Sequence, residues 1–447
     1  MNINSQFPLD SERIFMYNIY EYTFIYIIAY SSCFVKLIFR KIYGMLMEKV
    51  ILHCDFNSYY ASVETLYNEK LRNIPMAVCG DPALRHGIIL AQNDIAKKMG
   101  VTTGESIYSA KQKVPSLTTV TADYPKYVSF AKKARELFRE CSNEVIPFGL
   151  DEAWIVLPEK VDTIEKGAVI ADELRYWIKS ELGLTASVGV SFNYVFSKLA
   201  SDMKKPDATT TVSKDDLKPV IWNLPAYELL FVGPATRKKL MNMGILTIGD
   251  LARCNVKTLK RVLGKNGETL WMFANGDDRA FDPKTPENDP FKSIGNTLTM
   301  PYDLMNELDI LTMLYILSKT VSARLTKHKL KAKCIGILIK YSNFATINRQ
   351  LTPDLPIDNE QDIFKSVKRL FSGNFDKNPV RSIGVHVSKL QNSQFEQLSL
   401  FNENEDNFID EIKSIEINLS EKLKELRVEK YFNFNFAEES KLCAEDI

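Results

Sequence analysis

The sequence predicts an α+β fold that is divided into several domains. Apolar runs alternate with amphipathic stretches between residues 50 and 190, a helical stretch with glycine turns follows between 214 and 285, and strand and helix patterns return between 291 and 391. This alternation is typical of α/β and α+β cores. A chain of 447 residues, 45% of them apolar, is long enough for two to four domains of ~100–200 residues each.

In the first unit, short apolar runs predict strands and apolar positions at helical spacing predict helices. The expected strands are 50–56, 75–79, 87–92, 144–157 with an acidic turn in its middle, and 186–190. The expected helices are 58–71, 94–99, 127–141 and 163–182. In such a unit we expect acidic residues to cluster where strands end.

The pattern changes beyond residue 214. Short helices at 227–231 and 235–243 flank the turn Val232-Gly233-Pro234, and residues 263–267 suggest a repeat of this arrangement. After a linker at 282–290, helices at 310–325 and 361–371 and strands at 329–340 and 380–390 predict a second α+β unit. The stretch 402–447 is rich in Asn and Glu, which is typical of a mobile tail.

The distribution of charge singles out this second α+β unit. Residues 291–391 contain 15 Lys and Arg against 8 Asp and Glu, whereas residues 402–447 contain 6 against 13. A basic domain before an acidic tail favours a polyanionic partner, although a solvated surface explains the same counts. The seven cysteines are scattered without a CxxC pair, so the sequence indicates no zinc site or disulfide framework and favours a reducing cytoplasm.

The first 46 residues do not resemble the rest of the chain. An uncharged, aromatic-rich run at 22–35 is shorter than the ~20 residues that span a bilayer, and the positive charges follow it rather than precede it as in a signal peptide. We therefore expect 1–46 to be a dispensable extension, with the working protein starting near Met47 and no membrane partner. A membrane-associated helix is the alternative.

Three carboxylates are candidates for metal binding. Asp55 ends a buried apolar run, and Asp151-Glu152 lie in the turn between two others. Each residue alone is explained as a strand-end or turn residue. Together, at the strand ends of one sheet, they suit Mg²⁺, which prefers oxygen ligands and shares its shell with substrate phosphates. Two such ions ~3.5–4 Å apart can activate a hydroxyl and stabilise a leaving pyrophosphate.

Three motifs resemble those of the Y-family DNA polymerases, in particular the bacterial DNA polymerase IV group. They are DFNSYYASVE at 55–64, FGLDEAW at 148–154 and SVGVSFNYVFSKLASDMKKP at 187–206. The similarity runs from about residue 49 to 401, with the motifs in the family's order and spacing. It implies a right-hand polymerase with a ferredoxin-like palm (47–58 and 121–213), small fingers (59–120), a helix-hairpin-helix thumb (214–285) and an α+β little finger (291–391).

The resemblance also implies an activity. A protein of this family adds deoxynucleotides to a primer 3′-end on a template by two-metal-ion catalysis, with low fidelity, in translesion synthesis and DNA repair. We expect primer–template DNA and deoxynucleoside triphosphates as substrates, no proofreading exonuclease, a cytoplasmic location and a monomer.

The resemblance assigns roles to the motif residues. Asp55 and Asp151 would bridge two Mg²⁺ ions, with Mn²⁺ as a possible substitute. Glu152 would hold the ion that activates the primer hydroxyl, and the backbone carbonyl of Phe56 would complete the shell of the other.

Nucleotide contacts are expected from the same motifs. Tyr60 falls at the family's steric gate beside Tyr59, although packing in the core is the alternative for both rings. Lys205 falls where the family's lysine reaches the triphosphate.

One segment departs from the family pattern. Much of the family has a Tyr and an Arg before the position of Gly100, where this chain has Asp94 and Lys97. Lys97 can supply charge but not a bidentate fork. We therefore expect Asn93 or Lys98 to contribute to nucleotide binding.

Contacts to DNA and to a sliding clamp complete the expectations. Gly233 and Ala235 begin a helix whose free N–H groups can grip a phosphate. A basic cluster in the little finger is expected to grip DNA as well; its members are Arg324, Lys327, Lys329, Lys331 and Lys333. Residues 392–401 resemble the bacterial clamp-binding peptide, with anchors at Gln397, Leu398, Leu400 and Phe401.

Two other functions remain open from the residues alone. A nucleotide cyclase shares a palm-like sheet and two-metal chemistry but needs no thumb, basic domain or clamp peptide. For a DNA-bound scaffold with an inactive site, the intact Asp55, Asp151 and Glu152 argue against it, whereas Asp94 keeps it open.

Overall fold

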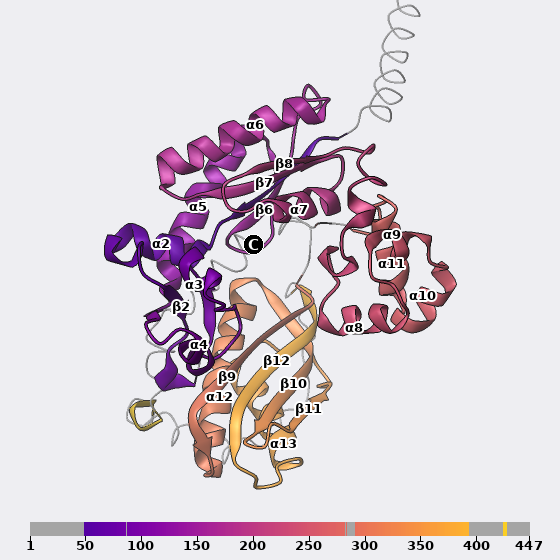
Figure 1. Ribbon diagram of the computed structural model, residues 1–447. Coiled ribbons are helices and arrows are strands. Elements are labelled where there is room, and N and C mark those ends of the chain that lie inside the picture. Colours follow the sequence, from indigo (N-terminus) through magenta and orange to yellow (C-terminus); the bar gives the residue numbers. More distant parts are fainter. Residues whose placement is uncertain (1–48, 86, 282, 284–290, 393–422, 427–447) are drawn as a thin grey trace, which may run out of the picture.

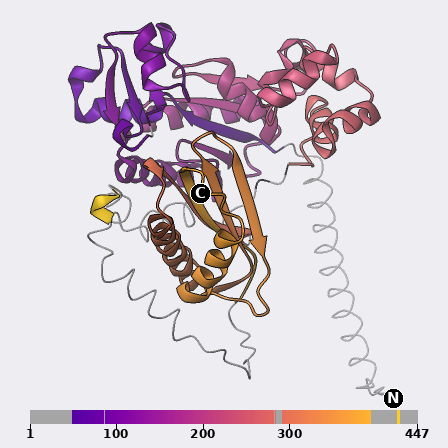
Figure 2. The same ribbon diagram turned by 90° about the horizontal axis from the view of Figure 1, so that it is seen from below.

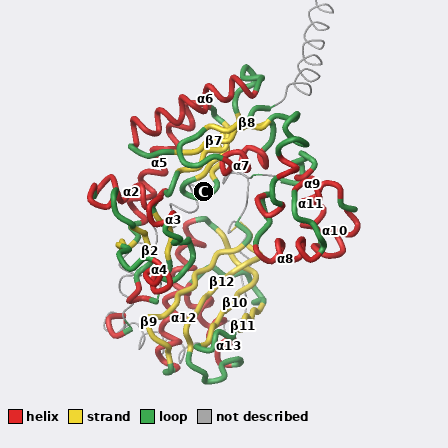
Figure 3. Tube along the Cα trace, viewed as in Figure 1, coloured by secondary structure: helices red, strands yellow, loops and turns green. Residues whose placement is uncertain are grey.

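The computed structural model describes residues 49–85, 87–281, 283, 291–392 and 423–426. These residues form three sheets and a helical unit (Figures 1 and 3). The three-stranded unit and the helical unit lie at opposite ends of the five-stranded sheet, and the four-stranded unit lies beneath it, as the view from below in Figure 2 also shows.

The five-stranded sheet has the order β5-β6-β1-β7-β8. Only the β7–β8 pair is parallel. Its strands are β1 (Ile51–Phe56), β5 (Glu144–Pro147), β6 (Glu152–Val156), β7 (Ala186–Ser191) and β8 (Thr209–Val212). The strand, acidic turn and strand expected at 144–157 are confirmed as β5 and β6, but β8 was not anticipated.

The two faces of this sheet differ. In β1, Leu52, Cys54 and Phe56 belong to an apolar core that extends into α5 (Tyr124–Cys141) and α6 (Ile164–Trp177). The alternate residues His53 and Asp55 belong to the other face, on which α7 (Tyr194–Met203) packs. Successive side chains of a strand point to opposite faces, so one fully buried strand supplies both a core and a polar surface.

Helix α7 lies unusually close to β7. A Cβ atom at Gly189 would collide with the backbone of Ser197 and Ser201. Because the obstacle is backbone rather than a flexible side chain, glycine is required there. This close approach brings the polar side of α7 against His53 and Asp55.

The three-stranded unit between residues 59 and 121 has the order β3-β2-β4. Its elements are α2 (Tyr59–Tyr67), β2 (Met76–Cys79), β3 (Ile89–Gln92), α3 (Asp94–Lys98), α4 (Ile107–Lys113) and β4 (Thr118–Thr121). The helix expected at 58–71 is shorter, because Asn68 is extended and a separate 3-10 turn, Glu69–Leu71, follows it. Asn68 accepts a hydrogen bond from Lys70 N and so caps this new turn.

The helical unit contains α8 (Pro234–Asn242), α9 (Ile248–Arg253), α10 (Val256–Leu263) and α11 (Lys265–Ala274). The short helix expected at 227–231 is a 3-10 turn, Ala226–Glu228. The suggested repeat at 263–267 is confirmed, since Gly264 (φ 66°) separates two α-helices. Only glycine adopts this left-handed conformation without strain.

The last unit is an antiparallel sheet with the order β11-β10-β12-β9 and two helices on one face. Its elements are β9 (Ser293–Leu304), α12 (Glu307–Lys327), β10 (Leu330–Tyr341), β11 (Thr346–Leu351), α13 (Glu360–Ser372) and β12 (Val380–Asn392). Strands β9 and β11 were not anticipated, because β9 contains few β-branched residues in a row and β11 is an edge strand with mostly exposed side chains. A pattern that lacks a buried face gives no strong periodic signal.

Some expectations lie outside the described residues. They are the extension 1–46, the anchors Gln397, Leu398, Leu400 and Phe401, and most of the tail 402–447. Among the described residues, no helix combines the length and apolarity needed to cross a membrane.

Candidate active site

Two carboxylates meet on the polar face of the five-stranded sheet. Asp55 of β1 is the register partner of Glu152 at the start of β6. Asp151 precedes Glu152, and its backbone carbonyl accepts a hydrogen bond from Phe56 N at 3.0 Å. The strand pairing therefore brings together the acids that are almost 100 residues apart in sequence.

Helix α7 adds two ammonium groups to these acids. Lys198 Nζ lies 3.1 Å from Asp55 Oδ2 and 2.6 Å from Glu152 Oε2. Lys205 Nζ, just beyond the helix, lies 2.7 Å from Asp55 Oδ2 and 2.8 Å from Asp202 Oδ1. Lysine positive charge thus compensates the acids from the α7 side.

Asp151 and Glu152 differ in their proton affinity. Burial, followed by the charges of Glu152 and Asp55, raises the pKa of Asp151 to about 6. Burial also acts to raise the pKa of Glu152, but the contacts with His53 and Lys198 outweigh it and lower that pKa to about 2. Asp151 is therefore the carboxylate whose charge is least compensated by the chain itself.

The carboxylates of Asp55, Asp151 and Glu152 are the type of ligand that hard divalent cations bind. Within the described part of the chain, no three Asp, Glu, His or Cys side chains already converge as a metal site, because Lys198 holds Asp55 and Glu152 in ion pairs. Glu152 Oε2 is buried and makes no aligned hydrogen bond there. A set of carboxylate oxygens with incomplete compensation is the donor set that Mg²⁺ prefers.

A cavity of about 420 Å³ opens beside the acids. Its lining includes Phe56, Asp94, Lys97, Lys98 and Lys205. Lys97 and Lys98 are exposed at the end of α3, and Asp94 accepts a hydrogen bond of 3.5 Å from Ser58 Oγ. The cavity therefore offers three ammonium groups and one carboxylate to a ligand.

The two adjacent tyrosines have different environments. Tyr59 is 3% exposed and donates a hydrogen bond to the backbone carbonyl of Tyr127, so its ring packs in the core. Tyr60 is partly exposed and stacks on the ring of Tyr127 at 4.3 Å. Only Tyr60 presents much of its ring at the surface.

The side chain of Asn93 lies at the start of α3. Its Oδ1 accepts hydrogen bonds from Ala96 N and Met76 N, and its Nδ2 donates to the Ile74 carbonyl at 2.8 Å. The side chain caps α3 and ties it to the segment before β2. Both ends of the Asn93 amide are thus engaged by the chain itself.

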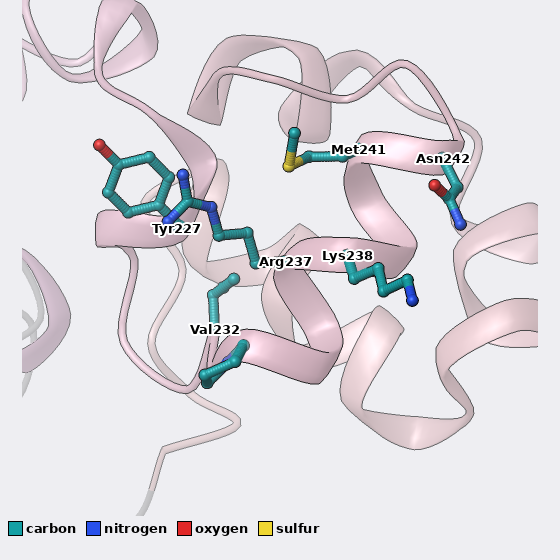
Figure 4. A pocket seen from close by; sticks show the side chains of 7 residues that line it. Tyr227, Val232, Arg237, Lys238, Met241 and Asn242 are labelled. Atoms are coloured by element: carbon teal, nitrogen blue, oxygen red, sulfur yellow. The ribbon is translucent and has the colours of Figure 1, made fainter. Parts of the chain in front are cut away.

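The start of α8 lies in open space. Gly233 is the N-cap of α8, Ala235 is exposed in its first turn, and no heavy atom lies within 4 Å of a Cβ built at Gly233. A neighbouring cavity of about 340 Å³ is lined by Arg237, which lies over the ring of Tyr227 at 4.0 Å, and by Lys238 (Figure 4). This helix N-terminus is therefore accessible and flanked by positive charge.

The basic cluster of the last unit follows α12 into β10. Lys327, Lys329 and Lys333 are exposed, and Lys331 is partly exposed. Arg324 differs, because its Nη1 donates to the Gly295 carbonyl at 3.0 Å and so joins α12 to β9.

The structure adds polar residues to the site that sequence reasoning left without a role. Lys198 contacts both Asp55 and Glu152, and His53 and Ser201 lie behind them. A signal was available, since Lys198 and Ser201 lie three residues apart and therefore on one face of α7. Without the packing of α7, that face could not be assigned to the acids.

Comparison with known proteins places these features in a family. The model of the impB/mucB/samB family matches residues 54–202, and that of its C-terminal domain matches 291–400. A third, described as the DNA polymerase-iota thumb domain, matches 228–278.

Individual proteins agree with the family models. DNA polymerase IV of Acetivibrio thermocellus is 47% identical over 360 residues, which cover 80% of this chain and 90% of that protein. DNA polymerase IV 1 of Bacillus subtilis is 36% identical, with 80% and 87% covered.

Solved structures share the fold at lower identity. A Y-family polymerase chimera of Dbh and Dpo4 superposes with a TM-score of 0.67 at 22% identity, covering 77% of this chain and 99% of that one. A Dbh ternary complex superposes with a TM-score of 0.55, also at 22% identity. The chain therefore belongs to the impB/mucB/samB family of Y-family DNA polymerases, in its DNA polymerase IV group.

Proposed function

We propose that this translesion DNA polymerase holds two divalent cations with Asp55, Asp151 and Glu152. The observation that carries the proposal is the pairing of Asp55 with Glu152 across β1 and β6, beside the undercompensated Asp151. Mg²⁺, or Mn²⁺ in its place, supplies activation of the primer 3′-hydroxyl and neutralisation of the leaving pyrophosphate. The carbonyl of Phe56, next to Asp55, adds an oxygen ligand.

The lysines have a separate task in this proposal. Lys205 and Lys97, with Lys98, surround the 420 Å³ cavity and bind the triphosphate of the incoming nucleotide. Lys198 neutralises Asp55 and Glu152, the acids that would hold the cations. Asp94 repels phosphate, so we expect the triphosphate to lie on the lysine side of the cavity.

Tyr60 is proposed as the steric gate for the sugar. Its ring stacks on Tyr127 and so has a fixed orientation at the edge of the site. Tyr59 acts only indirectly, because its buried ring supports Tyr60 at a centroid distance of 5.5 Å. A rigid aromatic surface excludes a 2′-hydroxyl by contact rather than by hydrogen bonding.

Primer–template DNA and deoxynucleoside triphosphates are the substrates, and we assign the domains accordingly. The palm comprises 47–58 and 121–213, the fingers 59–120, the thumb 214–285 and the little finger 291–391. The accessible N-terminus of α8 at Gly233 and Ala235 grips the phosphate backbone, as do the lysines that follow α12. Such contacts hold DNA without reading its sequence.

The remaining assignments rest on the sequence motifs. Residues 397–401 bind the bacterial sliding clamp, and 1–46 are dispensable. The protein acts as a cytoplasmic monomer with low fidelity and without a proofreading exonuclease.

Primer extension by residues 47–447 tests the metal site. With Mg²⁺ and single nucleotides, the parent protein adds the nucleotide that the template directs. Asp151→Ala lowers the rate by roughly 10³-fold or more, since the metal site is worth several kcal/mol of transition-state stabilisation. The exposed Asp215→Ala serves as a matched control and retains the parent rate.

Two outcomes contradict the proposal. If Asp151→Ala extends primers as fast as the Asp215→Ala control, Asp151 is not a metal ligand. If the parent binds DNA and extends no primer, the chain is a DNA-bound scaffold.

A further inference from the structure

A fully buried histidine lies behind the acids. His53 is 0% exposed and is on the polar face of β1, two residues before Asp55. Its register partners are Trp154 on β6 and Gly189 on β7, and its ring meets that of Trp154 edge-on at 5.0 Å. Burying an imidazole is costly unless its nitrogens find polar partners.

One ring nitrogen is anchored by α7. His53 Nδ1 lies 2.9 Å from Ser201 Oγ, which lies 2.7 Å from the Lys198 carbonyl oxygen. The hydroxyl hydrogen of Ser201 can rotate toward either acceptor. Ser201 thus fixes the ring to the helix that carries Lys198.

The other ring nitrogen faces a proposed metal ligand. His53 Nε2 lies 3.2 Å from Glu152 Oε2. An ionised carboxylate only accepts hydrogen bonds, so we assign the ring proton of His53 to Nε2. Nδ1 is then an acceptor, and the hydroxyl of Ser201 donates to it. Burial favours the neutral ring because it lowers the pKa of His53.

The contact is incomplete while Lys198 holds the same oxygen. Both His53 Nε2 and Glu152 Oε2 are buried, and within the described residues neither makes an aligned hydrogen bond. Lys198 Nζ lies closer to Oε2, at 2.6 Å. Glu152 Oε2 is therefore shared between Lys198 Nζ and His53 Nε2, and the histidine contact is the longer of the two.

We propose that His53 is a positioning residue that orients the Glu152 carboxylate for cation binding. The inference rests on the proposed metal role of Glu152. The series of contacts Ser201–His53–Glu152 links α7 to β1 and β1 to β6 on the polar face of the sheet. It limits rotation of the Glu152 carboxylate, and a hydrogen-bonded ligand is a better ligand than a free one.

A matched pair of amides tests the role of each nitrogen. In His53→Gln the amide nitrogen reaches the place of Nε2, whereas in His53→Asn the shorter side chain reaches only that of Nδ1. The readout is the Mn²⁺ affinity of the full chain with primer–template and no nucleotide, measured by the paramagnetic resonance of free Mn²⁺. We expect His53→Asn to weaken Mn²⁺ binding about tenfold or more, and His53→Gln to stay within about threefold of the wild type.

Kinetics supply a second readout that packing alone would not move. The proposal predicts that His53→Asn raises the KM for Mg²⁺ and recovers most of its extension rate at saturating Mg²⁺. The thermal midpoints of the two variants in EDTA should agree, because both lose the same ring. A kcat that stays low at any Mg²⁺ concentration overturns a role in metal binding.

Other outcomes also decide the matter. Asn and Gln variants that bind Mn²⁺ equally well, or equally poorly, show that the ring only fills space. If neither variant folds, Ser201→Ala keeps the ring but removes its anchor, and wild-type Mn²⁺ affinity in that variant overturns the proposal. A wild type that neither binds Mn²⁺ nor extends primers contradicts the proposed function instead.

Discussion

The five-stranded sheet buries its central strands β1 and β7 completely, whereas the four-stranded sheet leaves parts of β10 and β12 exposed, and the two sheets also differ in what they bury. In the four-stranded sheet, the inward residues of β10 and β12 are mostly Ile and Val, and a buried hydroxyl, Ser382, donates to the Leu298 carbonyl. In the five-stranded sheet, β1 and β6 bring His53, Asp55 and Glu152 to one face. The apolar opposite face is an ordinary core.

This difference separates stability from chemistry. A sheet with helices on one face can leave the other to solvent, whereas the five-stranded sheet covers its second face with α7 and encloses charges there. Enclosed charges interact strongly because water does not screen them. We therefore expect the charges on the five-stranded sheet to cost stability that the more apolar four-stranded sheet retains.

Glycine substitutions should show the largest contrast between the two sheets. At Gly189 a methyl group meets the backbone of α7, whereas at Gly336 it meets the imidazole of His386, which can rotate away. We expect Gly189→Ala to lower the free energy of unfolding by about 3 kcal/mol or more and Gly336→Ala by about 1 kcal/mol. Urea denaturation measures both, and equal losses would mean that α7 can move away from β7.

Apolar truncations should remove the contrast. Leu52 and Ile337 are each 0% exposed, on the core faces of β1 and β10. Leu52→Ala and Ile337→Ala should each cost about 3 kcal/mol by the loss of buried surface and the cavity left behind. Urea denaturation with a probe in each domain measures the two losses in free energy of unfolding. A difference between the two losses that exceeds the experimental error would contradict equal packing of the two cores.

The five-stranded sheet, unlike the four-stranded sheet, should show a pH-dependent stability that arises from Asp151. The pKa of Asp151 is raised to about 6 in the folded protein. The folded state therefore binds this proton more tightly than the unfolded state, and the resulting stability is present near pH 4 and is lost as the pH rises through 6. In EDTA at pH 7.5, Asp151→Asn should raise the free energy of unfolding by about 1–2 kcal/mol. If Asp151→Asn does not raise the free energy of unfolding at pH 7.5, or raises it equally at pH 4, the pKa of the Asp151 carboxyl is not the cause of the pH dependence.

Surface lysines of the four-stranded unit should give the smallest effect. Lys333 is exposed at the start of β10. Lys333→Ala should weaken primer–template binding a few-fold and reduce the slope of log affinity against log salt by about 0.9. Lys160, exposed after β6, is the matched control, and Lys160→Ala should leave the slope unchanged. Fluorescence anisotropy over a salt series measures both variants.

Much of the fold could be predicted from the sequence because its signals are local. The apolar run that became β1, the acidic turn before β6 and the long helix α12 are each visible within a window of a few turns. Strands β9 and β11 lacked such a signal. Their pairing with β12 and β10 creates the environment that makes them strands.

The sequence by itself determined the family and singled out the three carboxylates, since the motifs that carry them are contiguous. Only the tertiary structure decided which groups surround those acids. Lys198 meets Asp55 across 143 residues of sequence, His53 lies behind Glu152, and Asn93 is engaged by the backbone. Periodicity reports which face of an element is apolar, but the partner of a polar face depends on how distant segments pack, and no local pattern encodes that distance.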